Sequence, residues 1–274
     1  MIVNTTPTPT PEPPKPHKLL VVRDTLLEFP ELWKEVFIAG DKREEAAFAE
    51  FFVRSRCRRA DTPEDSDLVV FTGGSDVDPL LYGETPHSQT RFNSDRDKAD
   101  IELYKKCYDE GIPMFGVCRG MQFLHVMNGG SLYQHVDRHY GDHSMFDRKL
   151  RKHIKVSSVH HQAVIDNPAG GMVSIAECSE SNNRWYNGTK RDQMLTTRDI
   201  EAMWYPATGC FGVQGHPEYR GYSQFAVWTC DRLMDCFVTN PDFELRGNKR
   251  RMKKEVMDRR PSRVMSAKLL KELK

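Results

Sequence analysis

Short apolar runs alternate with amphipathic stretches along most of the chain. Buried strands are predicted where the apolar runs lie, at Lys18–Val22, Asp67–Phe71, Ile112–Phe115 and Phe211–Gln214. Helical spacing of the apolar positions predicts helices near residues 30–39, 42–54, 97–110 and 222–238. Weaker alternation predicts short antiparallel strands at residues 171–178, 193–197 and 200–204.

The order of these elements predicts the fold class. Strands alternate with helices, a β-rich part follows, and a last strand and helix complete the pattern. This order predicts an α/β fold of the flavodoxin-like type, with a mostly parallel sheet flanked by helices and a small antiparallel β addition. Residues 18–245 are expected to form this domain, after a disordered Pro/Thr-rich lead at residues 1–17 that contains six prolines.

The stretch Gly116–Gly120 joins a predicted strand to a predicted helix and contains Cys118. A strand-to-helix turn between glycines holds a nucleophile exposed at the edge of a sheet. It also places the sulfur at a helix N-terminus, where the dipole and free N–H groups favour the thiolate. Taken alone, this short motif fits a buried cysteine at a strand end equally well.

Two other segments could complete an acyl-transfer site around Cys118. Glycines follow the strand Asp67–Phe71, and Gly74 could therefore offer a backbone N–H to an oxyanion, although an ordinary tight turn has the same composition. His216 and Glu218 lie two residues apart after the last core strand, so both side chains point to one face. The imidazole can then meet the sulfur while the carboxylate holds its other nitrogen. The predicted catalytic triad is therefore Cys118, His216 and Glu218.

With these motifs in this order, residues 18–240 resemble the class I glutamine amidotransferase-like proteins. The resemblance is strongest to the γ-glutamyl hydrolase branch, especially γ-glutamyl-γ-aminobutyrate hydrolase. It rests on Thr72–Pro79 with Tyr82–Glu84, Arg96-Asp97, Cys118–Gln122 with Gly129–Gln134, and Val159–Gln162.

The resemblance implies roles for further residues of the catalytic domain. Backbone N–H groups of Gly74 and Arg119 would form the oxyanion hole, and Gln122 and His161 would bind the substrate. The chain departs from the family at Gly215, where an aromatic residue is usual, and a wider pocket beside His216 is expected from this change.

The implied chemistry is cysteine-dependent hydrolysis of a γ-glutamyl amide through a γ-glutamyl thioester, which needs no cofactor. The substrate would be a small γ-glutamyl compound or glutamine. In the alternative, the chain is the glutaminase component of an amidotransferase that delivers ammonia to a separate ATP-dependent synthetase. A non-catalytic binding module would be expected to carry a damaged triad, and this triad is intact by residue type.

Cysteine and histidine usage argues against a metal site and against a secreted protein. The histidines His135, His139, His143 and His153 show no ligand spacing with a nearby cysteine or carboxylate, so no metal is predicted. The seven cysteines are scattered and form no C-x-x-C pair, which favours a reducing, cytoplasmic location. No apolar run approaches the roughly 20 residues that span a bilayer, and no membrane partner is expected.

The C-terminal segment, residues 246–274, is a basic tail with 12 Lys/Arg and 3 Asp/Glu. Its apolar positions keep some helical spacing, which an arm binding only by charge would not need. We expect a helix that docks on a protein, either a synthetase partner or a second copy of this chain, rather than on nucleic acid. A solvated helical extension without a partner remains the alternative.

Overall fold

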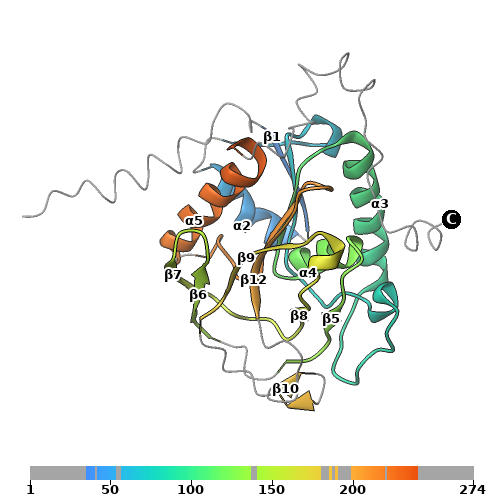
Figure 1. Cartoon of the computed structure of the whole chain (residues 1–274). Helices are drawn as coiled ribbons and strands as arrows, with labels where there is room; N and C mark the ends of the chain where they lie inside the picture. The colour runs from blue at the N-terminus through green and yellow to red at the C-terminus, as the bar shows by residue number, and fades with distance from the viewer. Residues whose placement is uncertain are drawn as a thin grey trace, which may run out of the picture.

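The computed structural model describes residues 35–40, 42–53, 57–136, 141–179, 185–186, 189–190, 199–219 and 221–239. A nine-stranded sheet forms the centre, with the order β2-β1-β3-β4-β13-β12-β9-β6-β7 (Figure 1). Its first five strands are parallel: β2 (Arg58–Arg59), β1 (Glu35–Ala39), β3 (Leu68–Phe71), β4 (Met114–Val117) and β13 (Cys210–Val213). The other four are antiparallel: β12 (Ile200–Tyr205), β9 (Val173–Cys178), β6 (His143–Asp147) and β7 (Lys152–Val156).

The parallel half has the strand order of a flavodoxin-like sheet, so the predicted fold class is confirmed. The antiparallel part is not a separate layer, because β12 pairs directly with β13 and extends the same sheet. Two small ribbons lie outside it: β5 (Leu132–Tyr133) pairs with β8 (Ala163–Val164), and β10 (Trp185–Tyr186) pairs with β11 (Thr189–Lys190).

Helices cover both faces of the sheet (Figure 1). Helices α2 (Lys42–Val53) and α5 (Ser223–Met234) pack on one face, and α3 (Ser94–Glu110) and α4 (Arg119–Met127) pack on the other. Every residue of β3 and β4 is buried, as expected for central strands covered on both sides. A π-helical turn, Asp235–Thr239, extends α5, and short 3₁₀ turns occur at Pro63–Asp65, Pro79–Tyr82 and Pro168–Gly170.

The helix predicted near residues 30–39 is wrong where the structure describes it, because Glu35–Ala39 is strand β1. Val36 and Ile38 are buried and alternate with half-buried neighbours, and the strand pairs in parallel with β3. The four apolar residues that follow Glu35 fit both periodicities, and pairing with a long-range partner decides between them. The helices predicted at residues 42–54, 97–110 and 222–238 are confirmed as α2, α3 and α5 with its π turn.

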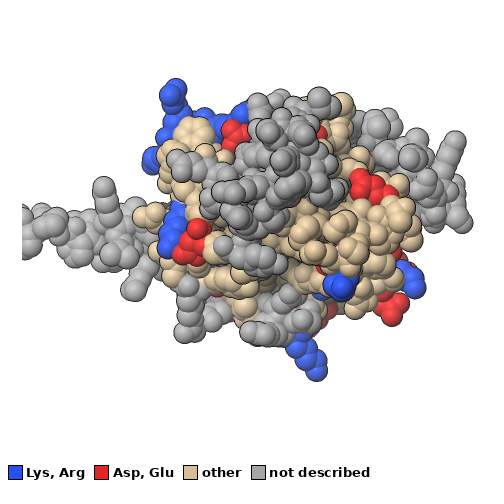
Figure 2. All heavy atoms as spheres, turned by 90° about the horizontal axis from the view of Figure 1, so that it is seen from below, with Lys and Arg blue, Asp and Glu red and all other residues tan. Residues whose placement is uncertain are grey.

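Several predictions fall on parts of the chain outside the described residues. These are the lead at residues 1–17, the strand Lys18–Val22, the strand at residues 193–197 and the basic tail at residues 246–274. The domain limits at residues 18 and 245 therefore stay predictions. Within the described part, the charged side chains on the face in Figure 2 mix both signs and gather into no single patch. The helices described there are all too short or too polar to span a membrane.

Candidate active site

The carboxyl ends of β3, β4 and β13 meet at one edge of the sheet and bring the predicted site together. Phe71 pairs with Gly116, and Val213 pairs with Val117, so the three strands end in register. The loop that starts at Thr72, the Cys118 turn and the segment after β13 therefore lie side by side. Open α/β sheets bind ligands at this kind of edge.

Cys118 occupies a strained turn between β4 and α4. Its φ of 53° and ψ of −110° are unusual for a residue with a side chain. The turn is possible because the two flanking glycines let backbones approach closely: a Cβ on Gly120 would lie 1.9 Å from the carbonyl oxygen of Phe71. A hydrogen bond of 2.9 Å from the N–H of Cys118 to the carbonyl oxygen of Val213 fixes it against β13.

His216 is held from three directions. Its ring Nδ1 lies 2.6 Å from Oε1 of Glu218, and its backbone N–H donates to Oγ of Ser157 at 2.9 Å. The ring of Tyr219 stacks on the imidazole, with centroids 4.4 Å apart and planes 8° from parallel. The sequence predicted that Glu218 contacts His216 but did not predict the stacking of Tyr219. The available signal for Tyr219 was its position directly after the His-Pro-Glu segment.

The electrostatic surroundings of His216 favour its charged form. Burial opposes protonation, but the negative charges of Cys118 and Glu218 on either side of the ring outweigh it and raise the pKa. Nε2 lies within electrostatic reach of Cys118, although among the described residues it makes no aligned hydrogen bond. Catalytic hydrogen bonds are often long before substrate binds. The arrangement therefore suits a thiolate and imidazolium pair.

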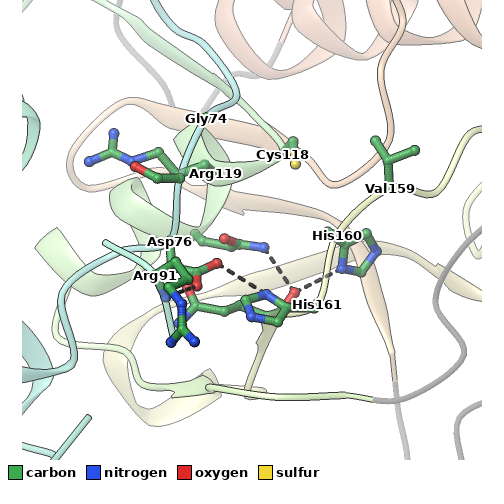
Figure 3. Close-up of a pocket in the computed structure, with 11 residues that line it drawn as sticks. Gly74, Asp76, Arg91, Cys118, Arg119, Val159, His160 and His161 are labelled. Carbon is green, nitrogen blue, oxygen red and sulfur yellow. Dashed lines mark hydrogen bonds and ion pairs between the residues drawn. The ribbon is translucent and has the colours of Figure 1, made fainter. Parts of the chain in front are cut away.

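A pocket of about 260 Å³ opens in front of Cys118 (Figure 3). Five of the predicted site residues line it: Gly74, Cys118, Arg119, Gln122 and His161. No role was predicted from the sequence for the other lining residues, which are Ser75, Asp76, Arg91, Val159, His160 and Gln162. Several of these lie within the motifs that carry the family resemblance, which was the signal available for them.

His161 makes polar contacts with two neighbouring residues at the pocket wall. Its Nδ1 lies 3.1 Å from Oδ1 of Asp76 (Figure 3). Its Nε2 lies 3.2 Å from the carbonyl oxygen of Gln89. The hydrogen bond to Asp76 raises the pKa of His161 against the opposing effect of burial. Arg91 also donates its backbone N–H to Asp76 at 2.7 Å. The carboxylate of Asp76 is therefore fixed in place at the pocket wall.

Gln122 lies at the base of the pocket on α4, and its amide N–H groups are used within the protein. They donate to the carbonyl oxygen of Gln162 at 2.9 Å and to Oε1 of Gln214 at 3.1 Å. A ligand would therefore meet Gln122 chiefly through its amide oxygen.

The side chain of Arg119 points away from Cys118 (Figure 3). It is 1% exposed and pairs with the buried carboxylates of Asp97 and Asp100 on α3, with the guanidinium 5.1 Å from the ring centroid of Phe123. Arg119 thus presents only its backbone to the pocket, and its side chain joins the Cys118 turn to α3. The sequence analysis assigned only the backbone role.

The space beside Gly215 is filled, contrary to the expectation of a wider pocket. A Cβ at this position would meet Cε1 of Phe225 and the carbonyl oxygen of Ser157, each at 3.0 Å. Phe225 lies on α5, which begins at Ser223, and its ring is already in contact with the position that a side chain at residue 215 would take. The expected widening is therefore wrong.

Comparison with known proteins identifies relatives for most of the described chain. Residues 60–218 match the family described as Peptidase C26. The glutamine amidotransferase-like YvdE homolog of Lactococcus lactis subsp. cremoris is 36% identical over 36% of this chain and 64% of its own length. Protein Rv2859c of Mycobacterium tuberculosis, provisionally named a glutamine amidotransferase, is 33% identical over 55% of this chain and 50% of its own length.

A named hydrolase and a solved structure are also similar to this chain. The γ-glutamyl-γ-aminobutyrate hydrolase of Escherichia coli O157:H7 is 29% identical over 60% of this chain and 67% of its own length. A glutamine amidotransferase structure from Thermotoga maritima has a TM-score of 0.49 at 14% identity, covering 75% of this chain and 85% of that one. The chain spans less than two thirds of the length of the first two relatives.

Proposed function

Because this chain belongs to the peptidase C26 family of class I glutamine amidotransferase-like proteins, we propose that it hydrolyses a γ-glutamyl amide through a thioester on Cys118. One observation carries the proposal. Glu218 holds Nδ1 of His216 at 2.6 Å, which leaves Nε2 for the sulfur of Cys118, a residue that lines the pocket. This is the arrangement of nucleophile, base and orienting carboxylate that acyl transfer needs.

In the first half of the reaction, the Cys118 thiolate attacks the side-chain carbonyl carbon of the γ-glutamyl group. A carbon–sulfur bond forms and the carbonyl oxygen becomes an oxyanion, which the backbone N–H groups of Gly74 and Arg119 would receive. Such donors are each worth about 3–4 kcal/mol in acyl-transfer sites. The carbon–nitrogen bond then breaks as the His216 imidazolium protonates the leaving amine.

In the second half, the now neutral His216 takes a proton from water, and the hydroxide attacks the thioester carbon. The carbon–sulfur bond breaks, glutamate leaves, and the thiolate and imidazolium are restored. Glu218 holds the ring in one orientation and stabilises its charge in both halves. No reductant, oxidant or second substrate is required to balance these steps.

The pocket also offers charges that match the α-substituents of a glutamyl group. Asp76, fixed by His161 and by the N–H of Arg91, would bind the α-ammonium, and the guanidinium of Arg91 would bind the α-carboxylate. The cavity of about 260 Å³ is smaller than the roughly 300 Å³ at which pockets for drug-sized ligands begin. A single amino acid and a small leaving group suit it better than a folded peptide.

Replacing Glu218 with glutamine is expected to lower kcat by about 10³–10⁴-fold, because the ring loses its fixed orientation and its stabilising charge. The loss of this negative charge also lowers the pKa of His216, since Glu218 is one of the groups that raise it. The alkaline limb of the kcat profile, where the imidazolium loses its proton, should therefore move to lower pH. An unchanged limb would show that Glu218 does not act through His216.

The function is tested by assaying γ-glutamyl-γ-aminobutyrate cleavage beside ammonia release from glutamine, with the Cys118→Ser variant as the control. Amine release without a partner chain supports the proposed hydrolase. Ammonia release from glutamine that requires an added synthetase supports the second candidate, a glutaminase component, which the names of the relatives favour. No turnover of either compound would contradict both and leave a binding module.

A further inference from the structure

A second group of reactive side chains lies at the same edge of the sheet as Cys118, on the antiparallel half. It consists of His143 on β6, Cys178 on β9 and Glu201 on β12. These strands are neighbours, and the pairing of Met145 with Cys178 and of Ile200 with Glu177 brings the three residues to one place. One ring nitrogen, the sulfur and one carboxylate oxygen all lie within 4.8 Å of one another.

The three side chains of this group are buried or half-buried. Glu201 is 1% exposed, His143 and Cys178 are half-buried, and Nε2 of His143 lies 2.9 Å from Oε1 of Glu201. A hydrogen bond between histidine and glutamate would account for that pair. The thiol of Cys178 converges on the same point from a third strand and adds a third donor atom.

The donor types select the ligand. Nitrogen, sulfur and carboxylate oxygen together suit Zn²⁺, whereas Mg²⁺ and Ca²⁺ take oxygen ligands alone. Bond lengths of about 2.0–2.3 Å in a tetrahedron place such donor atoms about 3.3–3.5 Å apart. The three side chains therefore need only small movements to reach a common ion, with a water molecule as the fourth ligand.

We propose that His143, Cys178 and Glu201 bind one Zn²⁺ ion that links β6, β9 and β12. The ion would fasten the antiparallel half of the sheet and take no part in the chemistry at Cys118. Sequence spacing could not reveal this site, because His143 lies 58 residues from Glu201 and its partners come from two other strands. The prediction that the chain binds no metal rested on ligands that are close in sequence.

The experiment uses the full chain carrying Cys118→Ala, so that the thiol at the pocket cannot bind metal. Zinc content after dialysis against Zn²⁺ is expected to be one ion per chain, and Co²⁺ substitution should give a sulfur-to-cobalt charge-transfer band. Cys178→Ser should abolish that band, and His143→Ala should weaken Zn²⁺ binding by at least about 100-fold. Added Zn²⁺ should raise the Tm of the parent protein but not that of these variants.

The matched control is His153→Ala, which removes an exposed histidine of β7 that hydrogen-bonds Ser179. This variant should keep the zinc content, the cobalt band and the Tm shift. A cobalt spectrum without a sulfur band, or a zinc content unchanged in both His143→Ala and Cys178→Ser, would overturn the proposal. So would a parent protein that binds no zinc. Because Cys178→Ser is nearly isosteric, its result does not depend on how well the His143 variant folds.

Discussion

Cys118→Ala is expected to abolish turnover, with a loss of about 10⁴-fold or more in kcat. The reason is chemical, because Cys118 carries the only thiol among the described residues that line the pocket. The fold should survive, since the change removes a single sulfur atom and the hydrogen bond from the backbone N–H to Val213 remains. Steady-state assays, with circular dichroism to check folding, measure both effects.

A glutamine-analogue electrophile provides the matching positive test, because it should label Cys118 in preference to the other cysteines. Burial raises the pKa of Cys57 and Cys236 to about 12, and burial also raises the pKa of Cys107 and Cys230. These thiols are therefore both hidden and protonated near neutral pH. Peptide mapping that finds the label elsewhere, together with activity in Cys118→Ala, would contradict the mechanism.

The variant Arg119→Met is expected to lower the free energy of unfolding by about 3–5 kcal/mol, although its side chain is outside the pocket. The change removes the cation that two buried carboxylates share. Asp97 is the more affected partner, because burial already raises its pKa despite Arg119, whereas Asp100 keeps an ion pair with Arg96 at 2.9 Å. Denaturant unfolding measures the loss.

Two measurements distinguish the loss of the buried ion pairs from a general sensitivity to mutation. They are the pH dependence of the unfolding free energy and a control variant at an exposed ion pair. Without Arg119 the native pKa of a buried carboxyl group rises, and protonation at lower pH then relieves the cost of burying its charge. The loss of unfolding free energy in Arg119→Met should therefore be smaller near pH 5 than near pH 8. Lys98→Met on α3, the helix of Asp97, breaks a pair with Asp95 whose side chains are 74% and 93% exposed. It should cost less than about 0.5 kcal/mol. Equal losses in the two variants would show that burial does not set the strength of the Arg119 pairs.

The parts of the fold that were predicted correctly are those with strong local signals. The run Asp67–Phe71 and the turn at Gly116–Gly120 combine continuous apolar residues with glycines, and both fix backbone geometry within a few residues. The contact between His216 and Glu218 was also predicted, although the two residues lie in a turn, with a hydrogen bond from the N–H of Tyr219 to the carbonyl oxygen of His216, and not in an extended segment. For these residues, local spacing and three-dimensional position agree.

The features that were missed depend on packing between different elements of the fold. Glu35–Ala39 is a strand because β2 and β3 flank it, and its own spacing did not distinguish the two structures. Phe225 fills the space beside Gly215 from a helix that begins eight residues later, at Ser223. The partners of Arg119 lie on α3, about a helix length earlier in the chain. Such packing is set by tertiary structure, which single-sequence patterns do not contain.

Because β4 pairs directly with β13, the positions of Cys118 and His216 depend little on the segment that forms the pocket wall. Cys118 and His216 follow adjacent strands, so their relation depends chiefly on that pairing, with one further hydrogen bond from the N–H of His216 to Oγ of Ser157 in the intervening segment. The intervening segment contributes Val159, His160 and His161 to the pocket wall. Under the proposed function, insertions or deletions between α4 and β12 that leave Ser157 in place would change which leaving group is accepted while Cys118 and His216 stay aligned. Selection can reshape one property without first repairing the other.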